Sequence, residues 1–203
     1  MDEIALVSAA RKGDLDAFNR LVLDYQQQVF NLALRMLNNP DAAEDATQLA
    51  FISVYRNLRG FRRGYFRAWI LRIVTNKCYD ELRRRHRQPI QPLEPVQQES
   101  GEEIENPAWL QDQGLSPQEI AEQKELDKVV QDCIEDLPPE FRAVVLLVDV
   151  QDMDYKEASR ILQKPLGTIK SRLARARRKL QDCLKGFREL LPAKFRLNSE
   201  GSR

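Results

Sequence analysis

The sequence has few of the residues on which most catalytic sites depend. Among its 203 residues there are 8 glycines, 3 cysteines and 1 histidine. The histidine, His86, lies in the basic run RRRHRQ, and there is no Cys/His cluster, glycine-rich phosphate loop or Ser/His/Asp arrangement. We therefore expect a protein that is not an enzyme and that binds no metal, cofactor or small-molecule substrate.

Cysteine pairs and long apolar runs are also missing. Cys78, Cys133 and Cys183 are widely spaced, and no two have the spacing of metal ligands. This pattern is typical of reduced, buried thiols in a cytosolic protein. No apolar run approaches the ~18–20 residues of a membrane span, and the first residues, MDEIALVSAARKGD, do not resemble a signal peptide. We expect a cytoplasmic protein without direct membrane insertion.

Helical periodicity dominates the sequence, and the alternation typical of strands is hard to find. Asp14 is placed to cap a helix that ends at the NNP sequence of residues 38–40, and Asp41 to cap a second helix that ends near Leu58. A third helix is expected from Phe66 to about His86. The apolar residues expected on the inner faces of the first two helices are Phe18, Leu21, Val22, Tyr25, Val29, Leu32, Ala33, Met36, Leu37, Ala43, Ala46, Ala50, Phe51 and Val54.

Composition divides the chain into two helical blocks. Residues 1–88 form the first, and residues 89–116, rich in Pro, Gln and Glu, have the composition of a flexible acidic linker. Residues 117–191 form the second, and residues 192–203 resemble a tail. The predicted fold class is all-α, with two small helical domains joined by the linker.

The second block ends in a pattern typical of a helix-turn-helix. LPPEFRAVVLLVDV predicts a buried helix that starts at its two prolines, and Asp154 is placed to cap the helix YKEASRILQ. KPLG then forms a turn before the basic segment TIKSRLARARRKL. A short helix, a tight turn and a basic second helix are typical of duplex DNA binding.

Charge is distributed unevenly, although the net charge is only +1. Residues 62–87 contain nine bases and two acids, a net of +7, and residues 164–188 contain nine bases and one acid, a net of +8. Between them, residues 94–127 contain one Lys and ten acids, a net of −9. A single basic helix is most often a solvated surface, but one in each domain favours a polyanion that is contacted twice.

The basic helix of the second block has one apolar stripe, Ile169, Leu173, Ala176 and Leu180. The opposite arc carries Lys170, Ser171, Ala174, Arg175 and Arg178, and its small residues allow close approach to a major groove. A membrane-surface helix would have bulkier apolar residues and a wider apolar face, so DNA is the favoured ligand.

The third helix of the first block carries a different stripe. Arg72, Asn76, Tyr79 and Arg83 share one face, where an amide, an aromatic ring and guanidinium groups suit exposed bases of melted DNA. Tyr65 precedes this helix, near Arg62 and Arg63. By contrast, Phe66, Trp69, Ile70 and Ile73 are expected in the core.

The acidic linker has several interpretations. The simplest is that its acids serve solubility alone. The alternatives are electrostatic: the linker mimics nucleic acid, follows a basic channel in a partner, or screens the two basic regions in the free protein. Replacing its acids with Gln distinguishes these, because the electrostatic hypotheses require a change in salt-dependent binding.

Four segments together resemble the extracytoplasmic-function (ECF) group of bacterial RNA polymerase sigma factors. They are PDAAEDATQLAFISVYRNL, FRAWILRIVTNKCYDELRRR, LPPEFRAVVLL and KPLGTIKSRLARARRKL, and they occur in the family's order. The resemblance implies a sigma factor that binds core RNA polymerase through its beta-prime and beta subunits, directs it to promoters and assists melting. It also implies an anti-sigma partner.

The resemblance assigns roles to the residues above. Asp45, Gln48 and Phe51 would contact beta-prime. The minus-ten element would be contacted by Arg62, Arg63, Tyr65, Arg72, Asn76, Tyr79 and Arg83, with the 62–67 loop holding a flipped base. The minus-thirty-five element would be contacted by Lys170, Ser171, Arg175 and Arg178.

The sequence departs from the family's pattern in places. Leu49 stands where the family often has an acid, and the loop FRRGYF is about one residue short. Ser159, Gln163 and Lys164 replace the usual Ala, Gly and apolar residue, which predicts a reshaped turn because Gly adopts such turns without strain. The alternative function is an autonomous helix-turn-helix regulator that binds duplex DNA without polymerase.

Overall fold

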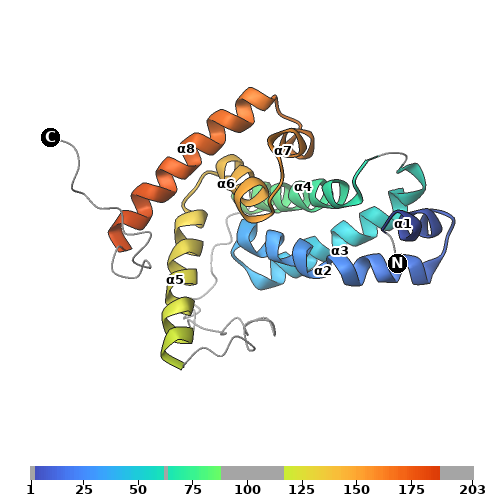
Figure 1. Ribbon diagram of the computed structural model, residues 1–203, viewed down its shortest axis with the longest axis horizontal. Helices are drawn as coiled ribbons and strands as arrows, with labels where there is room; N and C mark the ends of the chain where they lie inside the picture. Colours follow the sequence, from blue (N-terminus) through green and yellow to red (C-terminus); the bar gives the residue numbers. More distant parts are fainter. Residues whose placement is uncertain (1–2, 62–63, 88–116, 188–203) are drawn as a thin grey trace.

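The computed structural model describes residues 3–61, 64–87 and 117–187, and every regular element in these ranges is helical (Figure 1). The expected linker, 89–116, and the expected tail, 192–203, lie outside them. The first domain contains α1 (Glu3–Arg11), α2 (Leu15–Leu37), α3 (Pro40–Asn57), the 3-10 helix η1 (Leu58–Gly60) and α4 (Phe66–Arg87). The second contains α5 (Pro117–Glu135), α6 (Pro139–Val145), the π-helical turn η3 (Leu146–Val150), α7 (Tyr155–Leu162), α8 (Leu166–Leu184) and the 3-10 helix η4 (Lys185–Phe187). The all-α fold class is confirmed.

Helix boundaries in the first domain follow from short polar caps. The Asp14 carboxylate accepts a hydrogen bond from the Ala17 amide at 3.0 Å, as predicted. The prediction that Asp41 caps α3 is wrong, because Asn39 accepts from the Ala42 amide at 2.8 Å. Pro40 occupies the first helical position, which its fixed φ favours, so the cap must precede it.

The core of the first domain lies between α2, α3 and α4. Leu21, Val29, Leu32, Ala33 and Met36 of α2 are buried, which confirms the predicted inner face. On α4 the buried residues include Phe66, Ile70 and Cys78, while Trp69 and Ile73 are half-buried against the same core. The rings of Tyr25, Phe61, Phe66 and Trp69 form one cluster, with the Phe61 and Trp69 centroids 4.8 Å apart in a stacked arrangement.

The second domain contains the predicted helix-turn-helix. Asp154 accepts from the Glu157 amide at 2.7 Å and the Glu157 side chain accepts from the Asp154 amide, so α7 begins with a capping box. The predicted helix at LPPEFRAVVLLVDV begins at Pro139 but widens into a π-helical turn at residues 146–150. On α8, Ile169, Leu173 and Ala176 are buried and Leu180 is half-buried, which confirms the predicted apolar stripe.

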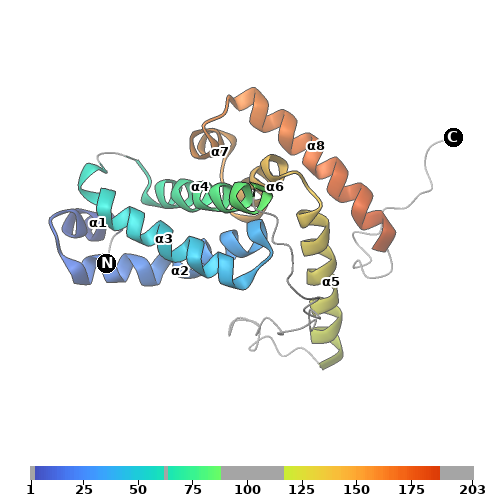
Figure 2. The ribbon, with the colours of Figure 1, turned by 180° about the vertical axis from the view of Figure 1, so that it is seen from behind.

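The two domains pack against each other, which the sequence did not predict (Figures 1 and 2). α5 and α6 lie against α2, and α7 lies against α4. Arg142 of α6 is buried and donates to the carbonyls of Met36, Glu135 and Leu137, and so joins the end of α2 to the end of α5. Arg67 of α4 donates to the Gln151 carbonyl at 2.6 Å.

The expectation of three reduced thiols is wrong for two of them. Cys133 of α5 and Cys183 of α8 form a disulfide across 50 residues of sequence. Sequence spacing gave no signal, because only the antiparallel packing of these helices brings the two cysteines together. Cys78 is free and buried, as expected. In a separate finding, no helix within the described ranges is long and apolar enough to cross a bilayer.

Candidate nucleic-acid interface

α8 presents a basic face to solvent. Lys170, Ser171, Ala174, Arg175 and Arg178 are all exposed, on the side opposite the buried stripe. We call Lys170, Ser171, Arg175 and Arg178 the recognition face. Among the residues that the structure describes, neither Lys170, Arg175 nor Arg178 forms an ion pair, so their charges are available to a ligand.

Two polar groups on α8 are already engaged within the protein. The Ser171 hydroxyl donates to the Thr168 carbonyl at 3.1 Å. Arg177 donates two hydrogen bonds to the Asp149 carboxylate, at 2.5 and 3.1 Å, and these bonds raise the pKa of Arg177. Arg177 therefore fixes α8 on η3 and does not belong to the recognition face.

The turn between α7 and α8 takes a strained conformation. Gln163 adopts the left-handed region, with φ 53° and ψ 44°, which is costly for a residue with a Cβ. Ser159 supports the turn: its carbonyl accepts from the amides of Gln163 and Lys164, and its hydroxyl donates to the Lys164 carbonyl at 2.5 Å. Gln163 thus takes the conformation that a glycine adopts freely, and the polar Ser159 helps to hold it.

The α4 face, defined as Arg72, Asn76, Tyr79 and Arg83, is partly solvent-exposed. Arg72, Asn76 and Arg83 are exposed, whereas Tyr79 is half-buried against the core. Arg83 donates to Asp80 at 3.1 Å, and these two residues line a shallow pocket with Arg84 and Arg87. The face therefore combines an exposed amide and exposed guanidinium groups with an aromatic ring that is less accessible than predicted.

Tyr79 brings the α4 face close to the second domain. Burial raises the pKa of Tyr79 to about 12, while the charge of Arg172 lowers it and that of Glu140 raises it. Arg172 belongs to α8 and Glu140 to α6, so both of these helices of the second domain lie near this ring. In this closed arrangement the α4 face and α8 are neighbours.

The loop before α4 is only partly described. Tyr65 is 70% exposed, next to the buried Phe66 and the stacked pair Phe61 and Trp69. An exposed ring beside a rigid aromatic cluster suits stacking on a base. The predicted contacts Arg62 and Arg63 lie outside the described residues.

α3 carries the surface predicted to contact polymerase. Asp45 and Gln48 are exposed, but Phe51 is half-buried and packs against the core. The same helix carries an exposed apolar stripe that was not predicted: Leu49, Ile52 and Tyr55 are 50%, 43% and 50% exposed. These residues recur every three positions, on a face offset from the buried alanines, and this spacing could have indicated a second apolar face.

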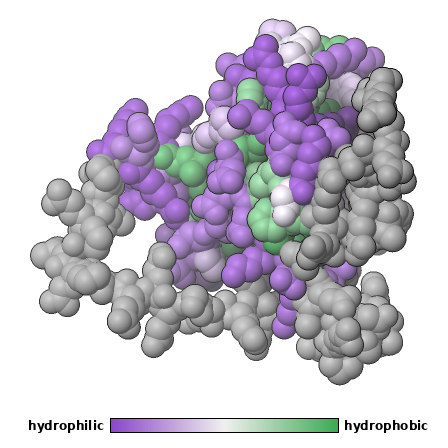
Figure 3. Space-filling view, turned by 90° about the vertical axis from the view of Figure 1, so that its left-hand side faces the viewer, coloured by the Kyte–Doolittle hydropathy of each residue, from purple (hydrophilic) through white to green (hydrophobic). Residues whose placement is uncertain are grey.

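On the side of the molecule that carries α5 and α8, hydrophilic residues dominate the surface and the apolar patches are small (Figure 3). This side is therefore mainly polar, and a polar surface is unsuited to a lipid interior.

Comparisons with known proteins agree with this arrangement. Residues 21–88 match Sigma-70 region 2, and residues 127–180 match Sigma-70 region 4. The RNA polymerase sigma-H factor of Pseudomonas aeruginosa is 33% identical over 180 residues, which cover 88% of this chain and 92% of that protein. The ECF RNA polymerase sigma factor SigE of Mycolicibacterium smegmatis is 34% identical over 84% of this chain, and the chain spans 62% of that relative's length.

A solved structure has the same fold and a related sequence. The sigma factor RpoE in complex with the anti-sigma factor NepR, from Bartonella quintana, superposes with a TM-score of 0.62 at 26% identity, covering 83% of this chain and 96% of that one. The two matched regions lie in the two helical domains, in the order of the four sequence segments. The chain belongs to the ECF RNA polymerase sigma factors.

Proposed function

We propose that this sigma factor contacts promoters through two surfaces: the recognition face of α8 for the minus-thirty-five element and the α4 face for the minus-ten element. The observation that carries this assignment is the recognition face itself. Lys170 and Arg175 are exposed around the small Ala174, above a buried apolar stripe. This geometry lets a helix enter a major groove, where guanidinium and ammonium groups donate to guanine acceptors or phosphates.

The α4 face acts on separated strands. Asn76 presents an amide that can hydrogen-bond to a base edge, and Tyr65 presents an exposed ring on which a flipped base can stack. Binding single strands better than duplex favours melting without a chemical fuel, because the binding free energy shifts the equilibrium toward open DNA.

The two domains must separate to reach both elements. Two sites two duplex turns apart lie about 70 Å apart, whereas Arg172 lies close enough to Tyr79 here for its charge to lower the pKa of that phenol. The interdomain contacts of Arg142 and Arg67 are replaced on polymerase. Residues 89–116 reach roughly 95 Å when fully extended, which is sufficient.

The remaining surfaces fit protein partners. Asp45, Gln48 and the apolar stripe of Leu49, Ile52 and Tyr55 contact core polymerase at beta-prime, and the second domain contacts beta. An anti-sigma factor is a further partner, since the Bartonella relative forms a complex with one, and we assign it part of the same surface. The protein acts in the cytoplasm, as a regulator and not as an enzyme.

Run-off transcription with purified core polymerase and genomic fragments tests this function. The expected result is specific transcripts that require the chain, and their start sites supply both promoter elements. Absence of any chain-dependent transcript would contradict the proposal.

The competing function is an autonomous regulator. A gel shift at physiological salt without polymerase distinguishes it from a sigma factor. The sigma factor is expected to bind promoter DNA weakly on its own, because each small domain contributes only part of the affinity. Tight specific binding without polymerase would instead support an autonomous regulator.

A further inference from the structure

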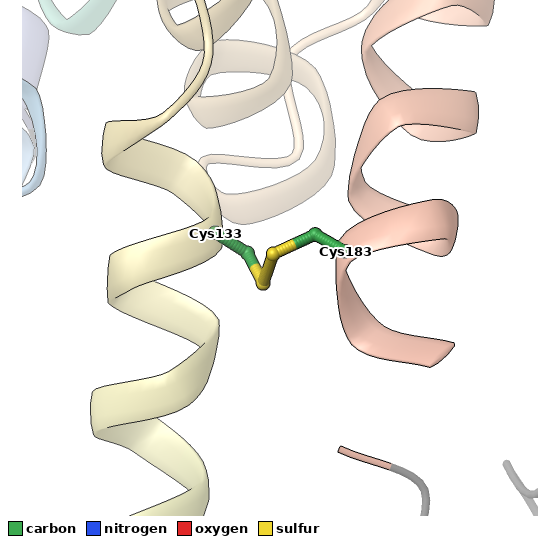
Figure 4. The surroundings of a disulfide bond; sticks show 2 residues. All are labelled: Cys133 and Cys183. Atoms are coloured by element: carbon green, nitrogen blue, oxygen red, sulfur yellow. A yellow bond between two sulfur atoms is a disulfide. The ribbon is translucent and has the colours of Figure 1, made fainter. Parts of the chain in front are cut away.

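The disulfide between α5 and α8 lies at one end of the recognition helix (Figure 4). Cys133 and Cys183 have Cα atoms 5.9 Å apart, within the range that an unstrained disulfide requires. The two helices therefore lie close enough for the side chains of Cys133 and Cys183 to form a bond without a shift of the backbone. Cys183 is in the last turn of α8, beyond the recognition face.

Apolar packing between these helices is thin at this end. The buried residues of α8 end at Ala176, and beyond it Leu180 and Cys183 are only half-buried. Cys133 of α5 is 1% exposed, and near it Val130 and Leu180 pack against the core only as half-buried residues. The covalent bond is therefore a major attachment of the last turns of α8.

α5 is in turn attached to the first domain. Gln131 donates to the Arg35 carbonyl at 3.4 Å, and Glu135 accepts from the Asn38 side chain. Cys133 lies between these two residues. The disulfide thus joins the recognition helix to the helix that contacts the end of α2.

The third cysteine, Cys78, is an internal reference for thiol reactivity. Cys78 is fully buried in the first domain, and burial raises its pKa to about 12. Its thiolate, the reactive form, is therefore scarce at neutral pH. Thiol chemistry in the native protein is confined to Cys133 and Cys183.

We propose that Cys133 and Cys183 form a redox-responsive site that reacts with cellular thiols and disulfides and controls how firmly α8 is attached to α5. In a reducing compartment such a pair is normally reduced, and disulfides there are usually transient and sensory. Oxidation then fastens the recognition helix, and reduction releases its last turns.

The exchange is balanced as a two-electron step. A thiolate of a dithiol reductant attacks the half-buried Cys183 sulfur, the S–S bond breaks, and Cys133 leaves as a thiolate that takes up a proton. The second thiol of the reductant resolves the mixed disulfide and releases Cys183. The pair gains two electrons and two protons, and the reductant becomes a disulfide; a low-molecular-weight disulfide drives the reverse reaction.

The consequence for DNA rests on the proposed function. Lys170, Arg175 and Arg178 share one helix with Cys183, so a firmly attached α8 holds these side chains in register with the major groove. We expect the oxidised chain to use the minus-thirty-five element better than the reduced chain. The minus-ten contact on α4 should not depend on this redox state.

The full-length chain, equilibrated in glutathione buffers of defined ratio, tests the site itself. Alkylation and mass spectrometry should show two thiols appearing together on reduction, with Cys78 unlabelled in the native state. Amide hydrogen exchange in residues 177–187 should rise about tenfold on reduction, while residues 29–37 stay unchanged. Separate labelling of Cys133 and Cys183 in oxidising buffer, or equal exchange in both states, would overturn the proposal.

Transcription by the holoenzyme then separates the redox site from the proposed function. On a promoter with an intact minus-thirty-five element, reduction should lower transcription at least about fivefold, and the C133S/C183S variant should be insensitive. A promoter with that element replaced should show no redox dependence. Transcription that is present but insensitive to redox state contradicts the redox inference alone, whereas no transcription in either state contradicts the proposed function.

Discussion

The two helices to which we assign DNA contacts, α4 and α8, are both strongly basic, but their charges are engaged differently. At the end of α4, Arg83 pairs with Asp80, and Arg84 and Arg85 both pair with Glu81, at 2.7–3.1 Å. On α8, no ion pair within the described chain engages Lys170, Arg175 or Arg178, and Asp182, near Arg178, pairs with Lys185 instead. The charge of α8 is therefore available to a polyanion, whereas the exposed groups of α4 outside these ion pairs include Arg72 and Asn76.

The domains behind these helices also differ. α4 belongs to a bundle with a large aromatic cluster, and its thiol is buried and unpaired. α8 belongs to a smaller domain that depends on a disulfide, a buried arginine and a polar turn. A small core buries less surface per residue, so covalent and polar supports matter more there. The following predictions test this contrast, from the largest expected effect to the smallest.

Phe66→Ala is expected to have the largest effect, because Phe66 is 1% exposed at the centre of the aromatic cluster. The loss should be about 4 kcal/mol in the free energy of unfolding of the first domain, measured by urea denaturation. Phe187→Ala is the matched control, since Phe187 is 42% exposed and its loss should have little effect. Equal effects of the two changes would mean that the cluster is not the main support of this domain.

Arg142→Ala should be the next most damaging change, because it removes the donor to the carbonyls of Met36, Glu135 and Leu137. Burial lowers the pKa of Arg142, and the negative charges of Glu135 and Asp136 offset only part of that effect. We expect a loss of about 3 kcal/mol, with looser packing between the domains seen by small-angle scattering. Arg177→Ala, which breaks a more exposed ion pair with Asp149, should cost less than about 1 kcal/mol. The reverse order would show that Arg142 is not the interdomain support.

Gln163→Gly should have the smallest effect and the opposite sign. Glycine adopts the left-handed conformation of this turn without a Cβ clash, so the second domain should gain about 1 kcal/mol. Gln163→Ala is the control, because alanine keeps the Cβ and should give no gain. Thermal denaturation of both variants checks this, and equal stabilities would place the strain elsewhere.

Local patterns predicted most of the helices and the division of α8 into a buried stripe and an exposed basic face. The stripe Ile169, Leu173 and Ala176 and the cap Asp154 follow from spacing over a few residues, and the structure has both. The predictions that failed depend on longer-range or finer geometry. The N-cap of α3 is Asn39 and not the predicted Asp41, because Pro40 occupies the first position of the helix.

Contacts between distant segments had no local signal. The Cys133–Cys183 bond and the reach of Arg142 to Met36 join residues 50 and 106 positions apart, and only tertiary packing brings them together. The apolar stripe at Leu49, Ile52 and Tyr55 was overlooked because exposed apolar residues on a helix resemble core residues in a sequence. The half-burial of Tyr79 likewise depends on the neighbouring core.

The division of labour between α4 and α8 is tested most directly by transcription from three templates with purified holoenzyme: an intact promoter, one with the minus-ten element replaced and one with the minus-thirty-five element replaced. Arg20→Ala and Asn57→Ala, exposed changes outside both faces, are the matched controls. We predict that Arg175→Ala lowers transcription about tenfold on the intact promoter and has no further effect once the minus-thirty-five element is replaced. Asn76→Ala should keep its full effect on that template and lose it on the template without the minus-ten element. If both variants lose their effects on the same template, the assignment of one element to each helix is contradicted.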